Sequence, residues 1–138
     1  MYLLDTNVIS ELMKTSPNAG LEDWLRTVAF YDLYLSTITI AEISNGIEKL
    51  NYGKKQDKLR QSLAEIKSGF AERILDFDYH SALQFGIVNN RARKLGLSIY
   101  PFDALLLATA ERYELGLITR NLKHFENRTE IFLHNPFE

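Results

Sequence analysis

The sequence predicts an α/β fold in which a small, mostly parallel sheet is covered by helices on both faces. Its expected strands are short apolar runs without polar alternation, the pattern of strands buried on both sides. These runs alternate with longer segments of helical periodicity. The 138 residues, 46% hydrophobic and 25% charged, have the composition of a globular protein. We therefore expect one three-layer domain over residues 1–138 with about four to five short strands.

Five short apolar runs are the expected strands, each bounded by polar or turn-forming residues. They are Tyr2–Leu4, Leu33–Leu35, Ile74–Leu75, Gly116–Thr119 and Ile131–Leu133.

Apolar residues at helical spacing predict six helices between these runs. They lie around residues 8–13, 21–28, 40–50, 59–70, 79–95 and 104–113. In the fifth helix we expect Ala82, Phe85, Val88, Ala92 and Leu95 to point inward. Gly96 is expected as its C′ cap, because glycine readily takes the left-handed conformation that ends many helices.

The composition excludes several classes of protein. The chain has no cysteine, which rules out disulfides, thiolate catalysis and cysteine-ligated zinc. The N-terminus has no basic segment before a long apolar one, so we expect no signal peptide. No apolar run approaches the roughly 20 residues of a membrane-spanning helix. We expect a cytoplasmic protein that does not bind membranes.

The net charge of −2 does not indicate nucleic-acid binding, but the charge is unevenly distributed. Residues 49–67 contain six basic and two acidic side chains, whereas residues 1–48 contain two basic and seven acidic ones. The basic stretch is either a solvated helix face or a docking surface for a polyanion.

Three carboxylates and one amide follow the expected strands. Asp5 and Asn121 come directly after the first and fourth strands, Glu42 lies in the helix after the second, and Asp103 opens the helix before the fourth. Ligands of open α/β sheets bind beyond the carboxyl ends of the strands. We therefore expect Asp5, Glu42, Asp103 and Asn121 to lie close together.

Each of these residues also has an ordinary structural explanation. Asp5 and Asp103 are good N-cap residues, Thr39 to Glu42 fits a capping box, and Asn121 suits a turn. As a group, however, clustered carboxylates repel one another unless a cation neutralises them. Oxygen ligands without thiolate or imidazole suit Mg²⁺ or Mn²⁺, which activate water for attack on phosphodiesters.

Four segments of the chain resemble the motifs of the PIN-domain family, and most closely its toxin ribonucleases of the VapC and FitB kind. The resemblance spans the whole chain. The matching segments are Met1–Leu12, which reads MYLLDTNVISEL, then Leu33–Ile47, Pro101–Ala110 (PFDALLLATA) and Leu117–Phe125, followed by the ending Asn135–Glu138.

The resemblance implies a PIN-like fold and a Mg²⁺-dependent endoribonuclease that is the toxin of a toxin–antitoxin pair. It assigns Asp5, Glu42 and Asp103 as metal ligands, and Asn121 as a fourth catalytic position where many relatives place Asp. Thr6, Asn7 and Thr119 become supporting polar residues. His124 departs from the family pattern, where Asp often precedes the Phe, so one firmly held metal is expected rather than two.

The resemblance further implies a homodimer and a small cognate antitoxin that blocks the active site. Trp24, Phe30 and Tyr31 are candidates for the surface that receives the antitoxin, although Trp24 also suits the core.

Other functions remain open at this point. A catalytically silent PIN-like binding module would have no need for the three acids. A receiver-type signalling domain would require adjacent acids after the first strand, whereas Asp5 stands alone. The three histidines are scattered along the chain, which argues against metal-free acid–base catalysis.

Overall fold

A computed structural model describes residues 1–138 of the chain. Its six helices are α1 (Thr6–Leu12), α2 (Ala19–Leu25), α3 (Thr37–Glu48), α4 (Lys54–Phe70), α5 (Tyr79–Lys94) and α6 (Pro101–Arg112). Single 3₁₀ turns occupy Phe30–Asp32, Ala71–Arg73 and Leu122–His124. None of the helices combines the length and the apolar character needed to cross a membrane.

Five strands form one sheet in the order β3-β2-β1-β4-β5. They are β1 (Tyr2–Leu4), β2 (Leu33–Ser36), β3 (Ile74–Leu75), β4 (Gly116–Ile118) and β5 (Leu133–His134). Every neighbouring pair is parallel, which confirms the predicted sheet. The last strand lies two residues later than its expected start, because Leu133 and His134 are the residues that pair with β4.

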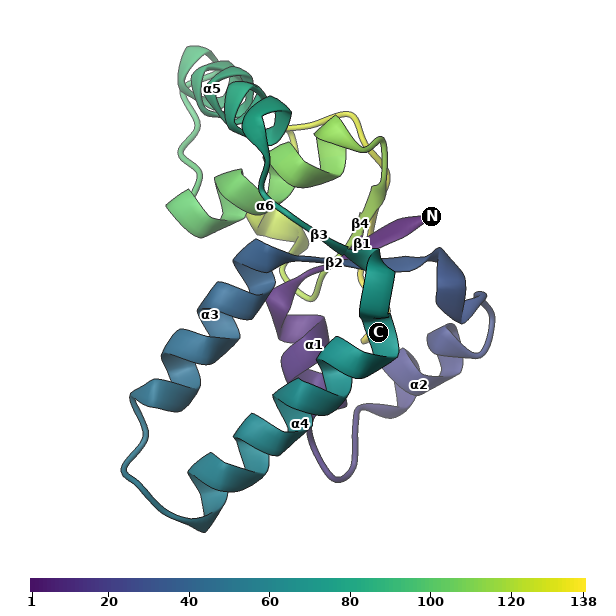
Figure 1. Cartoon of the computed structure of the whole chain (residues 1–138). Coiled ribbons are helices and arrows are strands. Elements are labelled where there is room, and N and C mark those ends of the chain that lie inside the picture. Colours follow the sequence, from purple (N-terminus) through teal and green to yellow (C-terminus); the bar gives the residue numbers. More distant parts are fainter.

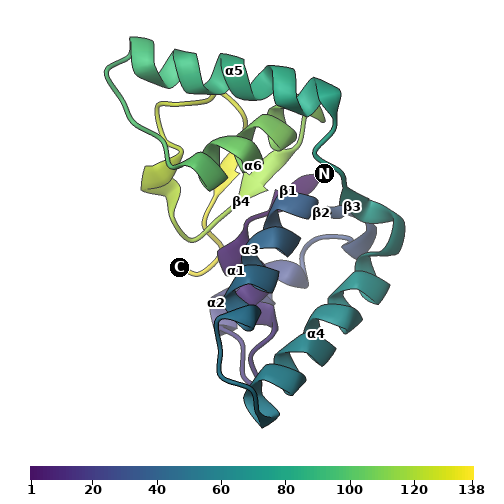
Figure 2. The same ribbon diagram turned by 60° about the vertical axis from the view of Figure 1, so that its left-hand side comes forward.

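The helices cover both faces of the sheet, as Figures 1 and 2 show: α5 and α6 lie on one side and α1 to α4 on the other. Consecutive residues of the central strands therefore point to opposite cores. Leu3 and Leu117 pack in the core beneath α5 and α6, whereas Leu4 and Ile118 pack against the other helices. Burial on both faces explains why these strands are apolar throughout.

Helix α5 ends as predicted but buries a narrower face than predicted. Gly96 has a φ of +72°, and the N–H of Leu97 donates to the carbonyl of Ala92, which closes the helix end. Val88 and Ala92 are buried, and Phe85 packs against the core. The prediction that Ala82 and Leu95 point inward was wrong, because both residues are exposed. The helix packs mainly on α6, and this contact leaves Ala82 and Leu95 uncovered.

Candidate active site

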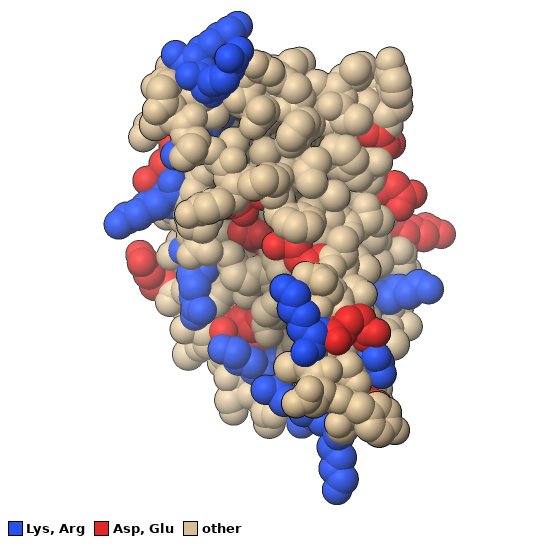
Figure 3. All heavy atoms as spheres, turned by 90° about the vertical axis from the view of Figure 1, so that its left-hand side faces the viewer, with Lys and Arg blue, Asp and Glu red and all other residues tan.

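A pocket of about 650 Å³ opens where β1 and β4 end, between α1, α3 and α6. In the space-filling view of Figure 3, acidic side chains lie near the centre of the face, and Lys and Arg side chains surround them below and to one side. The pocket is lined by Asp5, Thr6, Asn7, Ser10, Glu42, Tyr100, Pro101, Phe102, Asp103, Asn121 and His124. All four residues predicted from the strand ends are among them.

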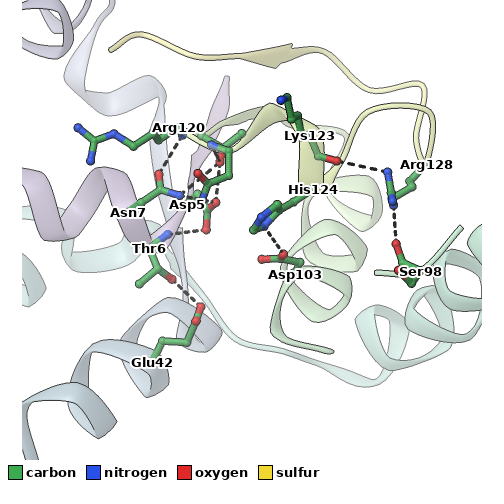
Figure 4. A network of polar contacts seen from close by, with 12 residues as sticks. Asp5, Thr6, Asn7, Glu42, Ser98, Asp103, Arg120, Lys123, His124 and Arg128 are labelled. Atoms are coloured by element: carbon green, nitrogen blue, oxygen red, sulfur yellow. Dashed lines mark hydrogen bonds and ion pairs between the residues drawn. The ribbon is translucent and has the colours of Figure 1, made fainter. Parts of the chain in front are cut away.

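Asp5 is the most rigidly held of the four, and only 5% of its surface is exposed. One carboxylate oxygen accepts the N–H of Thr6 at 2.7 Å, and the other accepts the hydroxyl of Thr119 at 2.7 Å and the amide of Asn7 at 3.0 Å. Figure 4 shows Thr6 and Asn7 of α1 beside the carboxylate of Asp5. Burial raises the pKa of Asp5 despite these bonds, and the charge of Asp103 adds to the rise.

Glu42 reaches the pocket from the second turn of α3. Its carboxylate accepts the hydroxyl of Thr6 at 2.6 Å, which ties it to the beginning of α1. Burial raises the pKa of Glu42, the hydrogen bond from Thr6 opposes the rise, and the charge of Asp5 adds to it.

Asp103 enters the pocket from the first turn of α6, opposite α1 and α3. Its carboxylate lies 2.9 Å from Nδ1 of His124, which the 3₁₀ turn after β4 supplies. Burial raises the pKa of Asp103, His124 works against this rise, and the charge of Glu42 adds to it.

Asn121 also lines the pocket, but its side chain is exposed. Its backbone N–H donates to the hydroxyl oxygen of Thr119 at 3.0 Å, the same hydroxyl that donates to Asp5. Thr119 therefore links the turn carrying Asn121 to the buried carboxylate.

Two of the capping explanations were wrong. Helix α3 begins at Thr37 and is capped by Ser36, whose hydroxyl oxygen accepts the N–H of Ile38 at 3.0 Å, so Glu42 closes no capping box. Helix α6 begins at Pro101 after Tyr100, which leaves Asp103 inside the first turn. Asp5 does cap α1, but its second oxygen faces Asn7 and Thr119 instead. Capping therefore accounts for neither Glu42 nor Asp103.

The pocket suits a hard divalent cation by its donor chemistry, because it contains three carboxylates, each with a pKa that the charge of another of the three raises. The structure nevertheless holds no group of three His, Asp or Glu side chains arranged to hold one ion together. The carboxylate of Asp5 is already oriented by its hydrogen bonds. The carboxylates of Glu42 and Asp103 are instead bonded to Thr6 and His124. These two partners compete with a cation for their carboxylates.

Three aromatic residues of the pocket were not predicted as part of the site. His124 pairs with Asp103, although its position in the sequence indicated only a departure from the family pattern. Tyr100 and Phe102 line the pocket with exposed rings on either side of Pro101. Nothing in the sequence distinguishes these aromatic residues from core residues, since exposure is a property of the folded chain.

Comparisons of the whole sequence identify the family. The PIN domain matches residues 2–130. The chain is 39% identical over 139 residues to the plasmid stability protein StbB of Pseudomonas syringae pv. tomato, and covers 99% of it. It is 37% identical to toxin FitB of Neisseria gonorrhoeae, again covering 99%. It is 32% identical over 139 residues to VapC ribonuclease Y4jK of Sinorhizobium fredii, of which it also covers 99%.

Solved structures agree with these relatives. The structure of FitAB bound to an IR36 DNA fragment contains a chain that matches this one with a TM-score of 0.91 at 35% identity, covering 100% of this chain and 96% of that one. The FitAcB structure from Neisseria gonorrhoeae matches with a TM-score of 0.90 at 37% identity, covering 99% of both chains. The chain therefore belongs to the PIN-domain family, in its VapC/FitB branch of toxin ribonucleases from toxin–antitoxin systems.

Proposed function

We propose that this chain, acting as a single domain of residues 1–138, is a Mg²⁺-dependent endoribonuclease whose acidic pocket cleaves RNA. One observation carries the proposal: Asp5, Glu42 and Asp103 line one pocket, and each has its pKa raised by burial and by another member of the set. Three mutually repelling carboxylates destabilise the folded protein unless a cation neutralises them. Mn²⁺ has the same ligand preferences and is expected to substitute.

The reaction is hydrolysis of a phosphodiester. A water oxygen attacks the phosphorus in line, the bond to the 3′-oxygen breaks, and that oxygen leaves as a hydroxyl. The products are a 3′-hydroxyl end and a 5′-phosphate end. When bound, Mg²⁺ supplies Lewis acidity that acidifies the attacking water and neutralises charge on the phosphate.

The residues of the pocket divide this work between them. Asp5, Glu42 and Asp103 are the proposed metal ligands and set the negative charge that attracts the ion. Thr119 and Asn7 orient the carboxylate of Asp5 by donating hydrogen bonds to the same oxygen. Asn121 orients water at the exposed mouth of the pocket, where its uncharged amide both donates and accepts.

Two protein partners complete the proposal. The first is a small antitoxin, supported by the similarity to the FitAB structure and to a DNA-bound VapBC structure from Salmonella typhimurium. Phe30 and Tyr31 were candidates for the surface that receives the antitoxin, and both are exposed. Trp24, the third candidate, packs against the core. The second partner is another copy of the chain. Leu83, Ile87 and Leu95 on and beyond α5 support a homodimer, since they are exposed along a shallow groove of about 750 Å³.

The deciding experiment incubates the purified protein with defined single-stranded RNAs in Mg²⁺, in Mn²⁺ and in EDTA. We expect internal cleavage only with the divalent ions, and fragments that a 5′-phosphate-dependent exonuclease degrades. Cleavage that persists in EDTA, or fragments ending in a 2′,3′-cyclic phosphate, would refute the proposed chemistry.

A further inference from the structure

Two aromatic side chains stand exposed at the mouth of the acidic pocket. Tyr100 keeps 66% and Phe102 46% of its surface accessible, and both line the pocket beside Asp103. The side chain of Tyr100 makes no hydrogen bond, and its ring lies 5.1 Å from the ring of His124. Neither aromatic residue belongs to a core cluster of the sheet. The rings therefore contribute little to folding at this position.

The backbone holds these rings in place. Tyr100 is the N-cap of α6, Pro101 follows as its first residue, and Phe102 is the second. Proline fixes its own φ and restricts the residue before it, so this segment loses little entropy on binding. Tyr100 and Asp103 are three residues apart at the helix start, and both contact His124. The ring and the carboxylate thus face the same small region.

The negative charge of the pocket disfavours RNA binding, and the exposed rings offer a contact that does not depend on charge. Its carboxylates repel the phosphates of RNA, so the pocket cannot hold the substrate by its own electrostatics. Stacking of a base on an aromatic ring requires no charge, and it accepts any base because every base has a π-face. A base within a duplex is already stacked on both sides and unavailable, so such a contact selects unpaired nucleotides.

We propose that Tyr100, with Phe102 beside it, forms a stacking platform for an unpaired RNA base next to the scissile phosphate. The inference rests on the proposed function in that it takes RNA as the ligand of this pocket. It assigns the contact with the unpaired base to Tyr100, and this stacking contact does not depend on which base is present.

The test measures stacking without cleavage. Short single-stranded RNAs carry 2-aminopurine, a base whose fluorescence falls on stacking, at each position in turn, and they are titrated with Asp5→Asn protein. We expect quenching at one or two adjacent positions. Adding Tyr100→Ala should abolish the quenching and weaken binding by about 5- to 100-fold. Tyr100→Phe should retain both, because the stacking face remains.

The chain offers a matched control in Tyr79, a tyrosine that is 71% exposed and lies 5.6 Å from the ring of His80, outside the pocket. Tyr79→Ala should leave quenching and affinity unchanged. Three results would overturn the platform: quenching that survives Tyr100→Ala, an equal loss with Tyr79→Ala, or a Tyr100→Ala protein that changes its oligomeric state and not its RNA affinity.

Failure of the platform is distinguishable from failure of the proposed function. A wild-type protein that cleaves RNA in Mg²⁺ while Tyr100→Ala cleaves it equally well refutes the platform alone. A wild-type protein that quenches the probe through Tyr100 but never cleaves refutes the nuclease alone.

Discussion

Replacing Asp5 by asparagine removes one negative charge from the pocket and leaves its shape nearly unchanged. The amide has nearly the volume of the carboxylate, and its oxygen can still accept the N–H of Thr6. Its NH₂ group, however, meets the amide of Asn7, which now donates to the carboxylate at 3.0 Å. The hydroxyl of Thr119 donates to the same oxygen at 2.7 Å, but it can rotate to accept the new N–H instead. The variant should therefore keep the fold, lose one hydrogen bond and lose one negative charge.

The expected magnitudes differ widely between stability and activity. One lost hydrogen bond costs about 1 kcal/mol, and relief of the repulsion from Asp103 offsets part of it. The metal-free variant should thus lie within about 1 kcal/mol of the wild type. Cleavage should fall by about 10²- to 10⁴-fold, because charge stabilisation by a bound metal contributes several kcal/mol. Asp5→Ala should instead destabilise by about 2–4 kcal/mol, since it leaves buried donors unpaired.

The assay pairs urea denaturation in EDTA with cleavage rates in Mg²⁺. Asp76→Asn is the matched control: Asp76 also directly follows a strand but is exposed and outside the pocket, so this variant should behave as wild type in both measurements. An Asp5→Asn protein that cuts RNA at the wild-type rate would show that the acidic pocket is not the catalytic centre.

Three further predictions concern charged groups of the protein. Charge reversal at Lys54, Lys55 and Lys58, which are exposed on α4 and form no ion pair, should weaken RNA binding and flatten its salt dependence; an unchanged salt slope would mark them as a solvated face. Mg²⁺ should raise the urea midpoint of the wild type and not that of Asp5→Asn, with equal shifts counting against the pocket as the metal site. The pKa of Asp78 is held below its usual value of 3.8, chiefly by the hydrogen bond from the N–H of Ser81 at the start of α5. The ionised carboxylate therefore stabilises the folded protein at pH values above 3.8, and this stabilisation is lost as the pH falls through the lowered pKa. Asp78→Asn should accordingly lower the melting temperature at pH 7, and this loss should shrink as pH falls below 3.8, as scanning calorimetry would reveal; a loss that does not change with pH contradicts this.

The sheet was predictable because its strands are buried on both faces, which leaves continuous apolar runs such as Tyr2–Leu4 in the sequence. Ligands of such sheets bind beyond the carboxyl ends of the strands, and this rule predicted that Asp5, Glu42, Asp103 and Asn121 lie together. The four residues line one pocket, although the order of the strands had not been predicted.

Local signals were less reliable than the sheet. The spacing of Thr39 and Glu42 matches a capping box, but β2 runs directly into α3 and Ser36 already caps that helix. At α6 the signal was present and misapplied, since Pro101 favours the first helical position over a cap at Asp103. Side-chain pairings across the fold, such as His124 with Asp103, depend on how the turn after β4 is placed, which no local pattern records.

The hydrogen bond between Thr119 and Asp5 joins residues 114 positions apart. The carboxylate of Asp5, directly after β1, is therefore oriented only when the segment after β4 has folded against it. A fragment that ends before residue 119 would lack both the hydroxyl that orients Asp5 and the turn that carries Asn121. The proposed metal ligands are therefore brought together only when the segment after β4 has folded against the beginning of α1.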